Sequence, residues 1–177
     1  MTNTHTPHRR AVLLGGSAIT LLACSGGMAG SDEKDVNTMT DSDTDTDWAN
    51  LSSAEWRERL TPDEFRVLRK EGTERPGSSP LNQEKREGTY VCAGCALPLF
   101  SSETKYESGT GWPSFYDPLP NALGFKRDFK LVLPRTEYHC IRCEGHQGHV
   151  FDDGPEPTGK RYCNNGVALD FIPADEA

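Results

Sequence analysis

The sequence of 177 residues predicts one mainly β domain of the α+β class, with two short helices at its start. Signals for helix initiation are confined to residues 52–72. After residue 88 the chain turns to short apolar runs separated by Gly and Pro, which is typical of strands and turns. Two Cys-x-x-Cys pairs lie among these runs and predict a metal site that stabilises the domain.

Both helix starts are capping boxes, in which a hydroxyl residue at the N-cap is followed three positions later by Glu. Ser52 precedes Glu55, and Thr61 precedes Glu64 with a proline at the first helical position between them. Gly72 is the expected stop of the second helix. Strands are expected at 89–92, 97–100, 129–133, 149–151 and 162–172.

The composition excludes one class of function and indicates a segment outside the domain. With 19 basic and 27 acidic residues the formal net charge is -8, so the chain lacks the basic surface that follows nucleic-acid phosphates. We therefore expect no nucleic-acid partner. Hydrophobic residues make up only 34%, which indicates that part of the chain does not enter a core.

Residues 1–23 have the pattern of a cleaved export signal. Arg9 and Arg10 precede an apolar run too short to span a bilayer, and paired arginines are typical of twin-arginine signals. The run ends in Leu-Leu-Ala-Cys, which resembles a lipobox in which Cys24 is lipidated. An ordinary secretory signal with an incidental cysteine is the alternative. The sequence thus predicts an exported, periplasmic or cell-surface protein anchored to a membrane by lipid.

Residues 24–48 are expected to form an acidic, disordered tether. The stretch 31–48 holds seven acids and one lysine, so it lacks the apolar surface that would offset the entropy lost on ordering. Metal binding by its aspartates is the less favoured interpretation. The folded domain is expected at 49–177.

Two Cys-x-x-Cys pairs of identical spacing are the strongest chemical signal. Four thiolates from two such knuckles suit one tetrahedral Zn²⁺ per chain, with no open position for a reactive water. Gly94 is expected to allow the sharp turn of the first knuckle. Disulfides are the alternative in an exported protein, although the twin-arginine route carries folded proteins whose metal is already loaded. The expected ligands are Cys92, Cys95, Cys140 and Cys143.

Cys163 is the cysteine that remains after the anchor and the ligands. It lies in an expected strand, where alternate residues share a face, so Arg161, Cys163 and Asn165 are predicted to project together. A guanidinium near the sulfur favours the thiolate, which is the nucleophilic form. A buried structural cysteine is the alternative.

His146 and His149 follow the second knuckle, so a metal bound there would also fix where they point. Histidine near a cysteine nucleophile is typical of acid–base chemistry around pH 7. Further metal ligation or a surface loop are the alternatives. Asp152 and Asp153 come next and are candidates for orienting an imidazole or a water.

Residues 108–115 combine two internal glycines, a proline and two aromatic side chains. This composition predicts a stiff, irregular loop. Trp112 within it is either part of the core or the wall of a site for an apolar group, because a large exposed aromatic side chain needs a partner.

Together, residues from about 56 to 173 resemble the B-type peptide-methionine (R)-S-oxide reductases. The resemblance implies a mainly β fold of two antiparallel sheets with short helices at its start, and a structural zinc in the Cys-x-x-Cys pairs. The motifs that carry it are Gly72-Thr-Glu-Arg-Pro-Gly77, Gly88-Thr-Tyr-Val-Cys-Ala-Gly-Cys95, Pro98-Leu-Phe100, Gly109-Thr-Gly-Trp-Pro-Ser-Phe115, Gly148-His-Val-Phe-Asp-Asp-Gly-Pro155 and Arg161-Tyr-Cys-Asn-Asn165.

The resemblance also implies a reaction. The Cys163 thiolate attacks the sulfur of an R-configured methionine sulfoxide, protein-bound or free, and Cys163 is left as a sulfenic acid. His149 is then the expected proton donor, and Arg161 stabilises the thiolate. Further residues implied to hold substrate and waters are His146, Asn165, Asp153, Phe151 and Trp112, the last against the S-methyl group.

Two positions depart from the family pattern. Many relatives have a resolving cysteine where this chain has Thr110, so the sulfenic acid is expected to be reduced directly by a thioredoxin-like protein or a small thiol. Gln147 stands where relatives usually carry an apolar residue. Nothing in the sequence demands more than a monomer.

Functions of other classes remain open at this point. One is a zinc-ribbon binding module in which Cys163 is buried and the histidines take no part. Another is a thiol–disulfide oxidoreductase that uses the Cys-x-x-Cys pairs, which a closed zinc site would exclude. A zinc deaminase is disfavoured because the His-x-Glu element is absent.

Overall fold

The computed structural model describes residues 46–130 and 133–176. The predicted signal 1–23, Cys24 and nearly all of the predicted tether therefore lie outside the described residues. A short 3-10 turn, Trp48–Asn50, opens the described part, and the Trp48 ring packs 6.0 Å from that of Trp56. No helix among the described residues is long and apolar enough to cross a membrane.

The two predicted helices form with both capping boxes in place. Helix α1 spans Ser53–Arg59 and helix α2 spans Pro62–Leu68. At the first, the Ser52 hydroxyl accepts from the backbone N–H of Glu55, whose carboxylate accepts from Ser52 in return. At the second, Thr61 and Glu64 make the same pair of bonds.

Helix α2 ends four residues before the expected stop at Gly72, so that boundary was wrong. Arg69 caps the helix through its N–H to Phe65 O, and Glu71 then takes a left-handed backbone conformation with φ 51°. Gly72 closes the turn by donating to Arg66 O, which leaves 2.8 Å between that oxygen and the place of a Cβ. Gly72 is thus needed for close approach rather than for helix termination.

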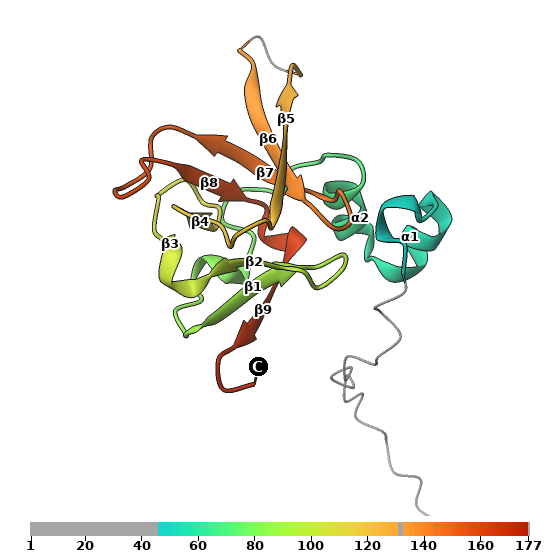
Figure 1. Cartoon of the computed structure of the whole chain (residues 1–177), viewed down its shortest axis with the longest axis horizontal. Coiled ribbons are helices and arrows are strands. Elements are labelled where there is room, and N and C mark those ends of the chain that lie inside the picture. The colour runs from blue at the N-terminus through green and yellow to red at the C-terminus, as the bar shows by residue number, and fades with distance from the viewer. Residues whose placement is uncertain (1–45, 131–132, 177) are drawn as a thin grey trace, which may run out of the picture. The chain divides into compact units, whose positions relative to one another are not determined.

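Within residues 46–130 and 133–176, nine strands form two antiparallel sheets, as the resemblance implied (Figure 1). The first sheet has the order β2-β1-β9 and the second the order β3-β4-β8-β7-β6-β5. The strands are β1 Gly88–Cys92, β2 Pro98–Ser101, β3 Lys105–Tyr106, β4 Ser114–Phe115, β5 Leu123–Asp128, β6 Arg135–Cys140, β7 His146–Phe151, β8 Arg161–Asn164 and β9 Leu169–Pro173.

Two of the expected strands were placed wrongly. The described residues of 129–133 lie in the turn between β5 and β6, where Phe129 is 71% and Leu133 78% exposed. The run 162–172 is broken by the 3-10 turn Gly166–Ala168, which sends β8 and β9 into different sheets. The buried Glu74 carboxylate holds this break by accepting the N–H groups that follow β8.

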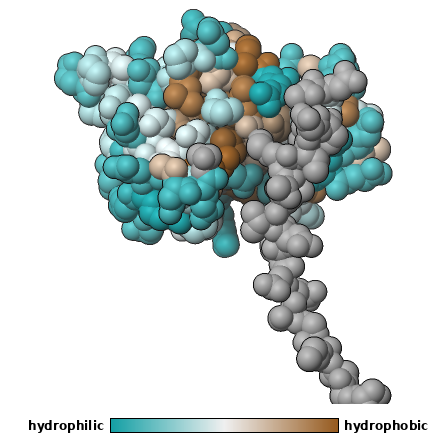
Figure 2. Space-filling model, turned by 60° about the horizontal axis from the view of Figure 1, so that its bottom comes forward, coloured by the Kyte–Doolittle hydropathy of each residue, from teal (hydrophilic) through white to brown (hydrophobic). Residues whose placement is uncertain are grey.

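An aromatic core joins the two sheets. Phe100 of β2 stacks on Phe115 of β4 with ring centroids 4.2 Å apart, and Tyr90 meets Phe115 edge-on at 4.9 Å. Tyr138 of β6 is fully buried beside them, and its hydroxyl donates to Asn164 Oδ1 at 2.8 Å. Through Tyr138 this core contacts β8 and helps to hold that strand in place. On the face shown in Figure 2, hydrophilic side chains surround a group of apolar ones.

Candidate active site

The four predicted ligand cysteines meet at one buried point. Their sulfur atoms all lie within 4.8 Å of one another, with 3.6 Å between Cys92 and Cys143 and 3.5 Å between Cys95 and Cys140. A disulfide requires about 2.0 Å. Sulfurs at the corners of a tetrahedron around Zn²⁺ lie about 3.8 Å apart. The donor set therefore fits a closed four-thiolate zinc site and not a pair of disulfides.

Gly94 lies in the turn of its knuckle, residues 93–95, as expected, but it does not take a left-handed backbone conformation there. The left-handed residues are Ala96 (φ 57°) and Glu144 (φ 58°), and each directly follows the second cysteine of its pair. A Cβ at Gly94 would lie 3.5 Å from both Leu68 and Trp56, which is ordinary van der Waals distance. The glycine thus sits where the helices pack against the cysteine cluster.

Gln147 connects the cysteine cluster to the strand that carries Cys163. It is fully buried, and its Nε2 donates to Cys92 Sγ at 3.3 Å while its Oε1 accepts from Asn164 Nδ2 at 3.2 Å. Its backbone oxygen accepts from Asn165 twice, from N and from Nδ2, both at 2.9 Å. The departure from an apolar residue at this position therefore supplies a polar link between the two sites.

Cys163 lines a cavity of about 120 Å³ on the second sheet. The register of β7 and β8 places it directly opposite His149. A cavity near 150 Å³ accommodates a molecule the size of benzene, so this one suits a single small group. Its lining residues are Thr73, Trp112, Arg135, Gly148, His149, Phe151, Cys163, Asn164 and Asn165. A larger groove of about 580 Å³, beside α2, is lined by neither cysteine nor histidine.

The surroundings of Cys163 favour its thiol form over the thiolate. Burial raises the pKa of its thiol, and the Arg161 charge and the Thr110 hydroxyl oppose that rise without cancelling it. The Arg161 guanidinium makes two bonds of 2.8 Å to Asp153 and lies 4.3 Å above the Phe151 ring. Its charge is therefore shared with Asp153. Arg161 is close enough to Cys163 for its charge and a hydrogen bond to lower the pKa of the thiol, although it is not among the residues that line the cavity.

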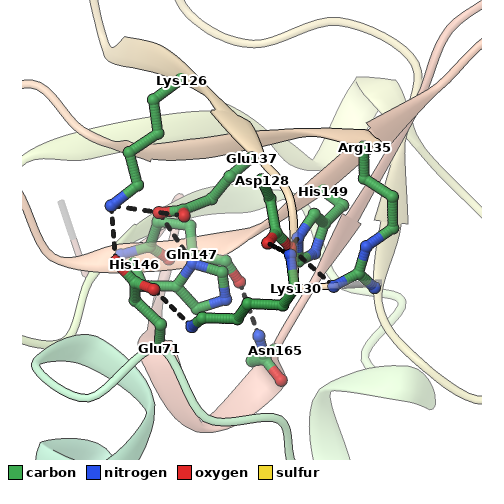
Figure 3. A network of polar contacts seen from close by, with 10 residues as sticks. All are labelled: Glu71, Lys126, Asp128, Lys130, Arg135, Glu137, His146, Gln147, His149 and Asn165. Carbon is green, nitrogen blue, oxygen red and sulfur yellow. Dashed lines mark hydrogen bonds and ion pairs between the residues drawn. The ribbon is translucent and has the colours of Figure 1, made fainter. Parts of the chain in front are cut away.

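His149 is held by a carboxylate from a distant strand. Its Nε2 lies 2.7 Å from Asp128 Oδ2, and the same oxygen accepts from Arg135 at 2.6 Å (Figure 3). Burial lowers the pKa of His149, and the bond to Asp128 acts in the opposite direction. The backbone N–H of Lys130, with His149 and Arg135, holds the pKa of Asp128 below its usual range.

The two aspartates that follow the histidines do not orient the imidazole. Asp152 pairs with Lys160, and Asp153 pairs with Arg161. Both carboxylates are mostly exposed, because they lie beyond the end of β7 where the chain returns to solvent. The orienting group is Asp128, which this sequence offers no local pattern to identify.

His146 stands behind His149 and does not line the cavity. Its ring is buried 5.5 Å from that of His149, and its Nδ1 lies 3.0 Å from Glu137 Oε1. Burial acts to raise the pKa of Glu137, but His146 and Lys126 together lower it. Lys126 also bonds Glu71, as Figure 3 shows, and with Lys130 it lowers the pKa of Glu71 to about 2. This network ties the β5–β6 hairpin to the turn after α2.

Trp112 and Asn165 are fixed at the cavity by backbone partners. The Trp112 indole donates to Glu74 O at 3.3 Å, so this side chain is a half-buried wall and not plain core. Asn165 is buried just past the end of β8, and its Oδ1 accepts from Glu74 N at 3.0 Å. Phe151 completes the apolar part of the lining.

Thr73, Asp128, Arg135 and Glu137 belong to the site or its support and were not identified from the sequence. Thr73 lines the cavity and is part of the motif 72–77, and its place in that motif is the signal that could have identified it. Asp128 ends β5, while Arg135 and Glu137 lie in the first half of β6, and strand register alone brings these three to the histidines of β7. No spacing within the sequence marks such a contact.

These features describe a mainly β domain with a buried cluster of four thiols and a separate cavity in which a fifth cysteine lies opposite a carboxylate-held histidine. The model of the SelR domain family matches residues 60–173. The similar proteins include the peptide methionine sulfoxide reductase MsrB of Methanosarcina barkeri, which is 52% identical over 71% of this chain and 89% of the relative. Those of Pseudomonas putida and Agrobacterium fabrum are 53% and 48% identical, over 70% and 75% of this chain and 93% and 98% of theirs.

The chain therefore belongs to the MsrB family and is a peptide-methionine (R)-S-oxide reductase, an enzyme of protein repair. This membership confirms the resemblance seen in the sequence and rules against a zinc-ribbon module without catalysis. A solved structure of the Mis18 'Yippee-like' domain matches with a TM-score of 0.39 at 19% identity, over 49% of this chain and 96% of that one. That similarity is too low to compare the folds.

Proposed function

We propose that Cys163 is the nucleophile that takes oxygen from the R epimer of methionine sulfoxide. Attack of the thiolate on the sulfoxide sulfur forms a bond between the two sulfurs while the sulfoxide oxygen is protonated. The hydroxyl then passes to the Cys163 sulfur, the S–O bond of the substrate and the bond between the two sulfurs break, and Cys163 is left as a sulfenic acid. Cys163 is oxidised by two electrons and the sulfoxide is reduced by two. Methionine leaves as the reduced thioether. The observation that carries this proposal is the cavity in which Cys163, His149 and Trp112 meet.

His149 supplies the proton in this proposal. Its Nε2 is engaged by Asp128, so proton exchange with the substrate falls to Nδ1. A neutral histidine also provides a base for the Cys163 proton, which matters because burial raises the pKa of that thiol. One histidine can therefore accept the proton from sulfur and deliver it to the sulfoxide oxygen.

The selectivity for one epimer follows from the fixed positions of the lining groups. Trp112 and Phe151 offer an apolar wall for the S-methyl group, whereas His149 and Asn165 offer polar atoms for the oxygen. Exchanging the methyl group and the oxygen places a polar atom against the apolar wall and leaves buried polar groups without a partner.

Regeneration by an external thiol is part of the same proposal. Among the described residues, the cysteines other than Cys163 all belong to the four-thiol cluster. A first external thiol displaces water from the sulfenic acid to form a mixed disulfide, and a second releases Cys163 as a thiol. Thr110 occupies the place of a resolving cysteine, which supports a donor such as a thioredoxin-like protein or a small thiol.

We further propose that the enzyme works outside the cytoplasm on a lipid anchor, as a monomer. The support is the sequence pattern of 1–24 and the acidic composition of the following residues. Labelling of the full-length protein with a radioactive fatty acid, compared between wild type and Cys24→Ala, tests the anchor. Equal labelling of the two forms would refute it.

The test of the chemistry uses separate R and S epimers of a peptide methionine sulfoxide with dithiothreitol as reductant. We expect turnover of the R epimer alone, none in Cys163→Ser, and a loss of about 10²-fold or more in His149→Asn. His139→Asn, on β6 and outside the cavity, is the matched control and should retain activity. Turnover of both epimers, or an active Cys163→Ser variant, would contradict the proposal.

The sulfenic acid is detected separately. After one turnover without reductant, dimedone should label the peptide that contains Cys163 and leave the peptides of the cysteine cluster unlabelled. Labelling at the cluster in place of Cys163 would move the reaction to the Cys-x-x-Cys pairs.

A further inference from the structure

Three side-chain hydroxyls form a chain from Ser114, the first residue of β4, to the Cys163 sulfur. The Ser114 and Ser108 oxygens are 2.7 Å apart, and those of Ser108 and Thr110 are 2.8 Å apart. The Thr110 hydroxyl then lies 4.0 Å from Cys163 Sγ, at the long end of the range for a hydrogen bond to sulfur. Ser114 is fully buried and also reaches Trp112 O at 3.1 Å.

Each hydroxyl has one hydrogen to donate, so the chain has a direction. When Cys163 is a thiol, its S–H donates to Thr110, Thr110 donates to Ser108, and Ser108 donates to Ser114. Ser114 in turn donates to the carbonyl oxygen of Trp112. Every hydroxyl in the chain is satisfied in this arrangement.

Loss of the Cys163 proton reverses the direction. The thiolate can only accept, so the Thr110 hydrogen turns to the sulfur, the Ser108 hydrogen to Thr110 and the Ser114 hydrogen to Ser108. No heavy atom has to leave its hydrogen-bonding distance, and the released proton goes to His149 or to water. A hydrogen bond to an ionised acceptor is stronger than one between neutral groups, which favours this second arrangement once the sulfur is charged.

We propose that Thr110 is a catalytic residue that donates a hydrogen bond to the Cys163 thiolate, and that Ser108 and Ser114 position its hydroxyl for this role. The proposal deepens the proposed function, since it rests on Cys163 as the nucleophile. It gives the residue at the place of a resolving cysteine a function of its own in the first step of the reaction.

The need for such a donor follows from the surroundings of Cys163. Burial acts against the thiolate. Arg161, on the same strand, favours the thiolate through its charge and a hydrogen bond, but its guanidinium is shared with Asp153, whose charge acts in the opposite direction. His149 faces the sulfur from β7. Tyr106 of β3 and Tyr138 of β6 are near enough for the thiolate charge to raise the pKa of each, beyond what burial does. Among these neighbours, Thr110 adds a donor directed at the sulfur.

The test measures the rate of Cys163 alkylation by iodoacetamide as a function of pH, in the zinc-loaded protein and without substrate. Mass spectrometry of the Cys163 peptide separates it from the cluster cysteines. In Thr110→Val, which keeps the shape and removes the hydroxyl, the midpoint should rise by about one pH unit, a tenfold loss of thiolate at neutral pH. Thr110→Ser should restore the wild-type midpoint.

Two further variants keep the result decisive. Ser108→Ala breaks the chain one link away from the sulfur and should raise the midpoint by a smaller amount. Thr104→Val is the matched control, because its hydroxyl donates to Ser101 O and is not linked to Cys163. An unchanged midpoint in Thr110→Val or, if that variant does not fold, in Ser108→Ala would overturn the proposal.

The assay is independent of the reductase reaction. If the wild-type protein failed to reduce either sulfoxide epimer, the proposed function would fall, but the alkylation midpoints would still report whether the hydroxyl chain stabilises the thiolate. If Thr110→Val and Thr104→Val shifted the midpoint equally, the effect would be a general loss of packing, and the proposal would be refuted.

Discussion

Replacing Asp128 by Asn isolates the contribution of the carboxylate to the chemistry of His149. The amide keeps the size of the side chain but removes the charge that lies 2.7 Å from Nε2. Because the bond to Asp128 opposes the effect of burial on the pKa of His149, its loss should lower that pKa further. A smaller fraction of His149 is then protonated at any pH near neutrality, and less of the enzyme can deliver a proton to the sulfoxide oxygen.

The magnitude follows from the burial of both partners. The side chains of Asp128 and His149 are only 5% and 13% exposed, so solvent screens the pair weakly. A hydrogen bond to a charged group contributes about 1.5 to 3 kcal/mol. With about 1.4 kcal/mol for each pKa unit, the pKa of His149 should fall by about one to two units.

The measurement is the pH profile of kcat/KM for a peptide (R)-sulfoxide with dithiothreitol in excess. Because the pKa of His149 is lowered and that of Cys163 is raised, the acid limb of the profile reports His149. We expect the acid limb of Asp128→Asn to lie about one to two pH units below that of the wild type, and the plateau to fall about 10- to 100-fold. Asp152→Asn should leave the profile unchanged, because Asp152 pairs with Lys160 outside the cavity. An acid limb at the wild-type position in a folded Asp128→Asn protein would refute a role for Asp128 in holding the charge of His149.

The same substitution has a signature in stability. The pKa of Asp128 is depressed in the folded protein, so its carboxylate stabilises the fold above the unfolded pKa of about 3.9. This contribution is lost as the pH falls through the folded pKa. Thermal unfolding should therefore show a lower Tm for Asp128→Asn at neutral pH and a converging Tm in strong acid.

Two other predictions concern the scaffold. In Gly148→Ala the new Cβ would lie 1.9 Å from the Cys163 carbonyl oxygen, so β7 and β8 must separate. We expect a loss of about 1 to 3 kcal/mol in unfolding free energy, with a larger relative loss of activity. Gly94→Ala, whose Cβ meets only ordinary contacts, is the control in urea unfolding, and equal stability of the two variants would contradict the geometry. Removal of metal by a chelator should lower the Tm and release one zinc per chain in a colorimetric assay, and an unchanged Tm would contradict a structural role for the cluster.

The sequence predicted the parts of the site that depend on short spacings. Ser52 with Glu55 and Thr61 with Glu64 form the capping boxes expected of them, since each box is complete within four residues. The two Cys-x-x-Cys knuckles predicted the thiol cluster because each pair is complete within four residues. His149 was placed near Cys163 from motif order, and the pairing of β7 with β8 makes the two residues direct neighbours.

The contacts that were missed depend on strand pairing. Asp128 and Glu137 reach the histidines through the register of β5, β6 and β7, which no local pattern encodes. The hairpin itself was misplaced because its strands carry charged residues such as Lys126 and Arg127, whereas its apolar run lies at the tip. The apolar residues Phe129 and Leu133 therefore predicted a buried strand, although both are exposed.

The aromatic core has a consequence for how the reductase domain withstands oxidation. The chain has three methionines, Met1, Met28 and Met39, and all of them precede residue 46. Phe, Tyr and Trp fill the interior where other domains use the flexible thioether, which oxidation would turn polar and so disrupt the packing. The reductase domain thus contains no methionine, the residue that it repairs. An oxidant that damages its substrate proteins cannot disrupt the interior of this domain through methionine oxidation.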